Sequence, residues 1–271
     1  MSGATAVQRA PVSLAVYSMW RRELTRFWRQ KSRLFGAVAT PLLFWLVLGA
    51  GFGGSFSHSA SDSDTNYLEY FFPGTVVLAV LFTAIYSTIS VIEDRQEGFL
   101  QGVMVAPVSR GGIVAGKMLG ATTLAMAQGL LMMLIAPLIG IPCTAMSFFY
   151  ALLALFGVAF GLSGLGLMIA WSMESTSGFH AIMNLLLMPM WLLSGAVFPL
   201  SDAHSLIKVL MYANPLTYGV SAFRSGLYHS AKSAPAQAAP LTACILVTAA
   251  FAILMVMGSI RLANRPSRNG R

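Results

Sequence analysis

Long stretches without any charged residue alternate with short charged stretches along this chain of 271 residues. One such stretch runs from Arg33 to His58 and another from Lys117 to Glu174. An α-helix rises 1.5 Å per residue, so about 20 apolar residues cross a hydrocarbon core of about 30 Å. The longer stretch is divided at GIPCT (140–144), where Pro142 stops a helix. The pattern predicts six membrane-spanning helices, at about 34–55, 70–92, 112–139, 145–172, 178–198 and 240–262.

The composition agrees with an all-α membrane protein. Hydrophobic residues make up 56% of the chain and charged residues only 10%, against about 25% charged in globular proteins, and the mean hydropathy is +0.72. The net charge of +8 lies at the flanks of the apolar stretches, which argues against nucleic-acid binding. We expect no cleaved signal peptide, because the first apolar stretch begins only at Leu34. Cys143 and Cys244 lie in or beside apolar stretches and indicate neither a disulfide framework nor a zinc site.

The basic residues predict the orientation. Six spans place both termini on one side, and that side then holds 14 of the 17 Lys and Arg residues. Since basic residues accumulate on the cytoplasmic side, we expect a multi-pass protein of the cytoplasmic (inner) membrane with both termini in the cytoplasm.

An amphipathic helix is predicted before the first span, at 13–33. Aromatic residues recur there at helical spacing, and most arginines fall elsewhere around the helix. We expect an interfacial helix with its aromatic side chains among lipid headgroups and its arginines near anionic lipid. A plain juxtamembrane anchor is a compatible alternative. The candidate residues are Trp20, Arg21, Arg22, Arg26, Phe27 and Trp28.

A near match to a phosphate-binding loop precedes the third span. Gly111, Gly116 and Lys117 fit the pattern G-x-x-x-x-G-K-[ST], but Met118 occupies the position of the magnesium-binding hydroxyl. No strand or metal-binding acidic residue accompanies the match. We therefore expect no nucleotide site here. Glycines instead start a tightly packed span, and Lys117 reaches the cytoplasmic headgroups.

Catalytic and metal-binding patterns are missing from the sequence. The four histidines are not spaced as metal ligands, and the acidic residues are expected to avoid the spans, so a proton relay is not predicted. These observations disfavour an enzyme, an ion pump or a proton-coupled carrier.

The cytoplasmic segment EDRQEGFLQGVMVAPVSRGG (93–112) combines a charged first turn with an apolar edge. It predicts a short helix outside the bilayer, at about 93–107, that docks on a partner. A loop packed on its own spans is the alternative. Further along the chain, residues 200–229 contain apolar stretches too short to span. We expect helices that lie in or re-enter the outer leaflet there.

Three blocks of this sequence resemble the permeases of type-2 ABC transporters. They are EDRQEG with VAPVSR in 93–110, NLLLMPMWLLSGAVFPL (184–200) and NPLTYGVSAFR (214–224). The blocks occur in the family's order and at the matching places in the six-span pattern, so that the resemblance covers nearly the whole chain.

The resemblance implies a single permease domain that pairs with a second copy, each copy docking a separate ATPase subunit that binds ATP and Mg²⁺. No cofactor is then expected in this chain. The ATPase-coupling residues would be Glu93, Asp94, Arg95, Glu97, Phe99, Leu100 and Arg110. Spans two and five would line the path of the substrate with Phe72, Phe82, Tyr86, Met188 and Trp191. The outer helices would use Asn214, Pro215, Tyr218 and Arg224 to satisfy exposed carbonyls, with an interfacial anchor as the alternative for Arg224.

The family resemblance implies export of an amphipathic, lipidic, drug-like or glycan substrate, and the apolar, adaptable residues of the path suit such cargo. Two other classes of function stay open on the sequence alone. An ion-coupled secondary carrier would need an acidic site in the bilayer, and a non-transporting membrane scaffold would need no ATPase.

Overall fold

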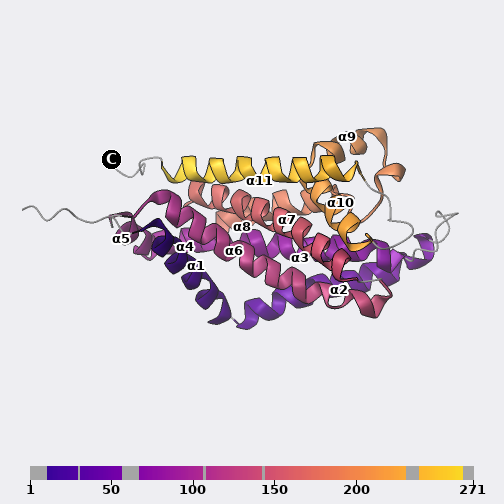
Figure 1. Ribbon diagram of the computed structural model, residues 1–271, viewed down its shortest axis with the longest axis horizontal. Coiled ribbons are helices and arrows are strands. Elements are labelled where there is room, and N and C mark those ends of the chain that lie inside the picture. Colours follow the sequence, from indigo (N-terminus) through magenta and orange to yellow (C-terminus); the bar gives the residue numbers. More distant parts are fainter. Residues whose placement is uncertain are drawn as a thin grey trace, which may run out of the picture.

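The computed structural model describes residues 11–29, 31–56, 67–105, 108–141, 144–229 and 238–264. Within them the fold is helical and contains no strand, which confirms the all-α class. In chain order the helices are α1 Val12–Arg29, α2 Lys31–Phe56, α3 Tyr67–Tyr86, η1 Ser87–Ile89, α4 Ser90–Gln96, α5 Phe99–Val105, α6 Arg110–Met133, η2 Ala136–Ile139, α7 Ala145–Ser172, α8 Thr176–Leu192, η3 Leu200–Asp202, α9 Ser205–Ala213, α10 Pro215–Leu227 and α11 Leu241–Ala263 (Figure 1).

Four helical segments in the described residues are long and apolar enough to cross a membrane: Tyr67–Gln96, Arg110–Ile139, Ala145–Ser172 and Leu241–Ala263. They match four of the predicted spans to within a few residues. The other two predicted spans correspond to α2 and α8. α8 has 17 residues, at the lower limit of about 17–25 for a span, and the apolar part of α2 is the shorter segment Ala39–Gly49. The six-span topology therefore stays a prediction.

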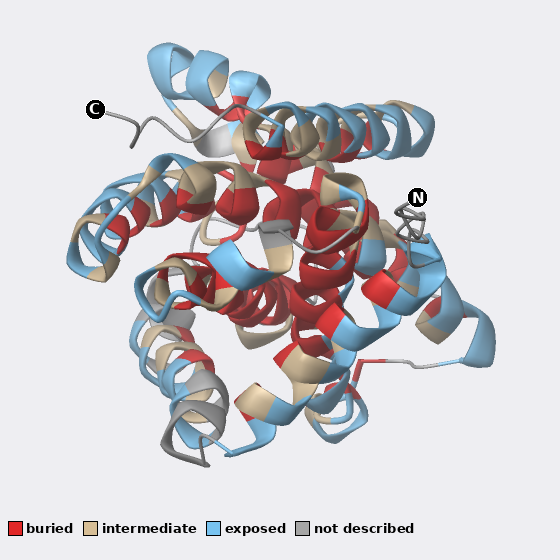
Figure 2. Cartoon of the chain, turned by 90° about the vertical axis from the view of Figure 1, so that its left-hand side faces the viewer, coloured by how far each residue is buried: buried red, intermediate tan, exposed pale blue. Residues whose placement is uncertain are grey.

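The second predicted span lies at the centre of the bundle. In Tyr67–Gln96, 89% of the apolar window is buried inside the chain, against 22% in α11. Helices α2, α6, α7, α8 and α10 all contact α3. Figure 2 shows the buried residues in the middle and the exposed ones on the outer helices. The outward apolar side chains, such as Leu246 and Leu254 of α11, suit contact with lipid.

Glycines bring α1 and α6 into close contact. A Cβ atom on Gly116 would lie 2.6 Å from Met19 Cβ and 2.8 Å from the Val16 carbonyl oxygen. A Cβ atom on Gly112 would meet Val12 and Ala15 only at the ordinary contact distances of 3.4 and 3.5 Å, whereas Gly111 faces open space. The predicted tight glycine packing at the start of this span is thus confirmed for Gly116. This packing holds α1, the predicted amphipathic helix, which extends over Val12–Arg29.

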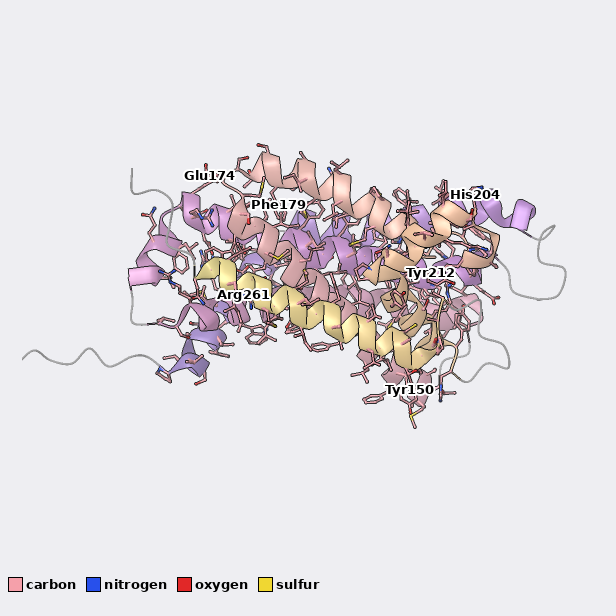
Figure 3. The ribbon with its side chains drawn as sticks, turned by 90° about the horizontal axis from the view of Figure 1, so that it is seen from above. Tyr150, Glu174, Phe179, His204, Tyr212 and Arg261 are labelled. Atoms are coloured by element: carbon pink, nitrogen blue, oxygen red, sulfur yellow. The ribbon has the colours of Figure 1, made fainter. Side chains whose placement is uncertain are left out.

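The bundle has two distinct ends. Arg110 donates a hydrogen bond to the Ala263 carbonyl oxygen over 3.1 Å, and Gly112 adjoins Val12, so the start of α1 and the end of α11 both contact the start of α6 at one end. Glu174 and Arg261 lie toward this end, and His204 and Tyr212 lie at the opposite end, with α9 and α10 (Figure 3). Two chain ends at the same end of the bundle are expected when the chain runs along the bundle an even number of times.

Candidate functional site

The short helix predicted at 93–107 is present as α5, but it begins later than expected. Gly98 adopts a φ of +76°, a conformation that costs a glycine little, and it separates α4 from α5. Glu93, Asp94 and Arg95 therefore end the preceding helix rather than forming the first turn of the short one. This is a correction to the predicted boundary. Ala106 and Pro107 lie outside the described residues.

Seven charged side chains converge where α1, α4 and α6 meet, and we call them the charged cluster. They are Arg22, Glu23, Arg26, Glu93, Asp94, Glu97 and Lys117. Asp94 lies at the centre and is completely buried. Arg22 binds it with two hydrogen bonds of 2.6 Å, and Arg26 Nη1 lies 3.1 Å from Asp94 Oδ1. A forked pair of this kind fixes geometry as well as charge.

Lys117 belongs to this cluster and not to the membrane surface. Its side chain is only 2% exposed. The ammonium lies 2.6 Å from Asp94 Oδ2 and 2.7 Å from Glu23 Oε1, and it donates to Ser90 Oγ over 3.1 Å. The expectation that Lys117 reaches headgroups is wrong, because the close approach of α1 at Gly116 brings Glu23 beside it. Asp94 follows the predicted span 70–92 by two residues, near the end of the apolar helical segment Tyr67–Gln96.

Two arginines of α1 also turn inward. Arg26 lies 2.7 Å from Glu93 Oε2, and Arg22 lies 3.7 Å above the Phe99 ring. Hydrogen bonding to Asp94 raises the pKa of Arg22 above its ordinary value. The expectation that these arginines face anionic lipid is wrong for both. Arg21, in contrast, is exposed.

The aromatic residues of α1 are divided between the protein and its surroundings. Phe27 is buried, and the Trp20 indole donates to Thr123 Oγ1 over 3.1 Å. Trp28 is 77% exposed. Of these three, Trp28 alone presents most of its surface outward, as a headgroup contact requires.

The remaining predicted coupling residues hold neighbouring segments in place. Arg95 donates to the carbonyl oxygens of Met173 and Trp171, over 3.0 and 3.2 Å, and so fixes the connection between α7 and α8. Leu100 is buried. The surface of this region is formed instead by Glu97, whose side chain is 60% exposed, and by Gln101 and Gly102.

The predicted path residues differ in exposure. Phe72 and Trp191 are buried within the chain, and the Trp191 indole donates to the Gly74 carbonyl oxygen over 2.8 Å. Neither offers surface to a substrate in this conformation. Phe82, Tyr86 and Met188 are half-buried and retain accessible surface.

The outer block satisfies backbone carbonyls as expected. Asn214 donates to the Met190 carbonyl oxygen over 2.6 Å and caps α10, which starts at Pro215. Tyr218 donates to Tyr212 over 2.9 Å. Arg224 donates to Gly195 over 3.1 Å and lies 4.3 Å above the Tyr70 ring. Arg224 is 2% exposed, so the alternative of an interfacial anchor is wrong.

Among known proteins, the ABC-2 type transporter family matches residues 15–228, from α1 through α10. The chain belongs to the ABC-2 type transporter family. Nodulation protein J of Rhizobium leguminosarum bv. trifolii is 29% identical to this ABC-2 permease over 230 residues, covering 83% of the chain and 85% of the relative. The inner membrane transport permease YadH of Escherichia coli (strain K12) is 25% identical over 216 residues, covering 79% and 82%. This protein is thus a membrane permease.

Sequence reasoning missed four residues of this permease's candidate site: Glu23, Ser90, Gln101 and Lys117 as an ion-pair partner. Glu23 and Lys117 each carry a charge on a helix face that packs against glycine or apolar residues. This placement could have identified Glu23 and Lys117 as members of the site, because a charge on a buried helix face requires a partner of opposite charge.

Proposed function

We propose that this chain is the permease subunit of an ATP-driven exporter. Two copies pair in the inner membrane, each with six spans and cytoplasmic termini, and each docks a separate ATPase subunit that binds ATP and Mg²⁺. The pair moves an amphipathic, lipidic, drug-like or glycan substrate out of the cytoplasm. Membership of the ABC-2 type transporter family supports this proposal.

The observation that carries the proposal is the placement of α5. This short helix stands at the same end of the bundle as α1 and the end of α11, and it exposes Gln101 and Gly102, while Glu97 is exposed just before it. The charged cluster lies behind it and ties α4 to α1 and α6. A push on α5 would therefore move packed helices together as a rigid unit instead of bending a loop.

An ion-coupled carrier is the second candidate, because Asp94 is a buried carboxylate within the helical segment Tyr67–Gln96. The contacts of Asp94 argue for a structural role. Both of its oxygens lie within 3.1 Å of a cationic group, from Arg22, Arg26 or Lys117. A transported cation would have to displace one of these charges. Within the described residues, no group of three or more His, Cys, Asp or Glu side chains could hold a metal ion.

The decisive experiment is co-expression with a separate ABC ATPase subunit. We expect the two proteins to co-purify, and ATP hydrolysis in proteoliposomes to rise with substrates from a panel of lipids, drugs and glycans. Uptake driven by a pH gradient without ATP would favour the carrier instead. Absence of both a bound ATPase and transport would favour a membrane scaffold.

A further inference from the structure

The central helix of the bundle changes its winding near its inner end. Between α3, which ends at Tyr86, and α4, which begins at Ser90, the residues Ser87–Ile89 form the 3₁₀ turn η1. The backbone ψ angles are −21° at Tyr86, −25° at Ile89 and −22° at Ser90, whereas an α-helix has a ψ of about −42°. Hydrogen bonds in a 3₁₀ turn are less well aligned, and such a turn inside a longer helix often marks a hinge.

Two consecutive side chains explain the turn. Ser87 Oγ donates to the Thr83 carbonyl oxygen over 2.6 Å, and Thr88 Oγ1 donates to the Ile85 carbonyl oxygen over 2.7 Å. These hydroxyl groups compete with backbone N–H groups for the same carbonyl oxygens, which weakens and bends a helix. Both side chains are buried, so they find few other acceptors. The local sequence therefore favours a weak point in the helix at this place.

A third residue of the same kind shows that one such hydrogen bond is not sufficient. Thr75 Oγ1 donates to the Phe71 carbonyl oxygen over 3.2 Å, yet α3 continues as an α-helix through Thr75. The turn at Ser87–Ile89 differs because two hydroxyl residues are adjacent there and a β-branched isoleucine, which has a low helix propensity, follows them.

Helix α7 meets the turn through a glycine. A Cβ atom on Gly166 would lie 2.8 Å from Thr88 Oγ1 and 3.0 Å from the Ile85 Cα. A side chain at this position would therefore displace the Thr88 hydroxyl from its bond to Ile85. Glycine also weakens a helix interior, so α7 has its own weak point beside the turn and can bend together with α3.

The turn separates two differently bound parts of the chain. Outward from it, α3 contacts α2, α6, α7, α8 and α10 in the middle of the bundle. Inward from it, Asp94 of α4 binds Arg22 of α1 and Lys117 at the start of α6. Helices α1, α4 and α5 lie together at this end (Figure 1). The charged cluster thus joins α4 to α1 on the inner side of the turn.

We propose that Ser87–Ile89 is a hinge at which α4, with α5 and α1, changes its angle to α3. A few residues at the end of a helix can absorb such a change while the packed parts on both sides stay rigid. The role of the hinge in transport rests on the proposed function, since motion of α5 on an ATPase would enter the bundle at this turn. The hinge itself is a property of this chain alone.

Hydrogen–deuterium exchange on the full chain in nanodiscs, without any ATPase, tests the hinge. We expect the amides of residues 86–92 to exchange at least about tenfold faster than those of residues 76–82, since a hinge opens locally. In the double variant Ser87→Ala with Thr88→Ala, the two rates should agree within about threefold, because alanine favours the α-helix. Thr75→Ala, which removes the same kind of hydrogen bond from the regular part of α3, should leave residues 86–92 unchanged.

Distances between spin labels measure the change in angle directly. One label is placed at Gln101→Cys, exposed on α5, and the other at Leu246→Cys, 69% exposed on α11, in a chain with Ser in place of Cys143 and Cys244. Singly labelled samples identify distances between copies. We expect the distance distribution to narrow about twofold in the double variant, because its helix is stiffer.

Three results would overturn the hinge. They are equal exchange of residues 86–92 and 76–82 in the wild-type chain, unchanged exchange in the double variant, and a distance distribution of the same width in both chains. Because no ATPase is present, failure of the ATPase pairing would leave these measurements unaffected. The hinge and the proposed function can therefore fail separately.

Discussion

The Lys117 ammonium lies 2.6 Å from Asp94 Oδ2 and joins the start of α6 to the helix that leads into α5. Glu23 of α1 completes this contact from the other side, 2.7 Å away. Taking such charges out of water is costly, and mutual attraction offsets the cost only while every partner is present. The contact is therefore sensitive to the loss of any single member.

Replacing Lys117 with Met should destabilise the protein strongly. The change leaves Glu23 and Asp94 buried with one cation fewer, and breaking a buried pair in this way costs about 3–5 kcal/mol in the free energy of unfolding. A lower midpoint of thermal unfolding in nanodiscs would report it. Arg21→Met, which removes an exposed cation from α1, is the matched control and should change the midpoint little.

A double substitution separates charge from packing in this test. Glu23→Leu combined with Lys117→Met removes one negative and one positive charge together, and we expect it to restore most of the lost stability. If the double variant is as unstable as Lys117→Met alone, the contact between these two charges does not explain the loss.

The packing of α1 on α6 depends on Gly116. In Gly116→Ala the new methyl group would lie 2.8 Å from the Val16 carbonyl oxygen and 2.6 Å from Met19 Cβ, so that α1 must shift. Overpacking of this kind costs about 1–3 kcal/mol. Gly111→Ala, five positions earlier and facing open space, should be neutral or stabilising, since alanine favours the helix. Thermal unfolding of both variants, side by side, checks the difference.

Much of the fold follows from the apolar pattern, because spacing between charges fixes helix length. The span predicted at 145–172 matches α7, Ala145–Ser172, and the glycine packing of α6 was also foreseen. The side on which a charge lies was harder to predict. Lys117, Arg22 and Arg26 were expected to face lipid, because a single helix shows only that they are polar. Their inward position depends on carboxylates that arrive 23 to 94 residues away in the sequence.

The candidate site shows the same division. Asn214, Tyr218 and Arg224 were expected to satisfy carbonyls, and they do, because short helices after a span leave local backbone groups unpaired. Which of the predicted path residues are exposed could not be predicted in this way. Phe72 and Phe82 are both aromatic residues of the same predicted span, and only the packing of neighbouring helices decides that the first is buried and the second accessible.

The exposed surface formed by α5 and by Glu97, just before it, should transmit the ATPase cycle. Glu97→Arg reverses the charge of a side chain that is 60% exposed and lies 3.7 Å from Arg26. We expect insertion and folding to be retained, and substrate-stimulated ATP hydrolysis to fall at least tenfold in proteoliposomes containing the ATPase. Glu174→Arg, an exposed carboxylate on the connection between α7 and α8, is the matched control. Normal transport by Glu97→Arg with normal ATPase binding would contradict docking at this surface.

The topology can be tested by single cysteines in a chain whose Cys143 and Cys244 have been replaced by Ser. Tyr212 is 49% exposed in α9, and Gln101 and Glu174 are exposed at the opposite end. An impermeant maleimide applied to spheroplasts should label Tyr212→Cys at once. It should label Gln101→Cys and Glu174→Cys only after permeabilisation.

The same labelling decides whether α2 and α8 cross the membrane. Glu174 and Tyr212 flank α8, so opposite accessibility of these two positions requires a crossing between them. For α2 the test is Asp62→Cys, which lies outside the described residues and should be labelled from outside, together with Arg268→Cys, which should be protected until permeabilisation. Protection of Asp62→Cys would leave α2 on one side of the membrane. A fully reversed pattern would show that the protein has the opposite orientation, with most of its basic residues outside the cell, against the positive-inside rule.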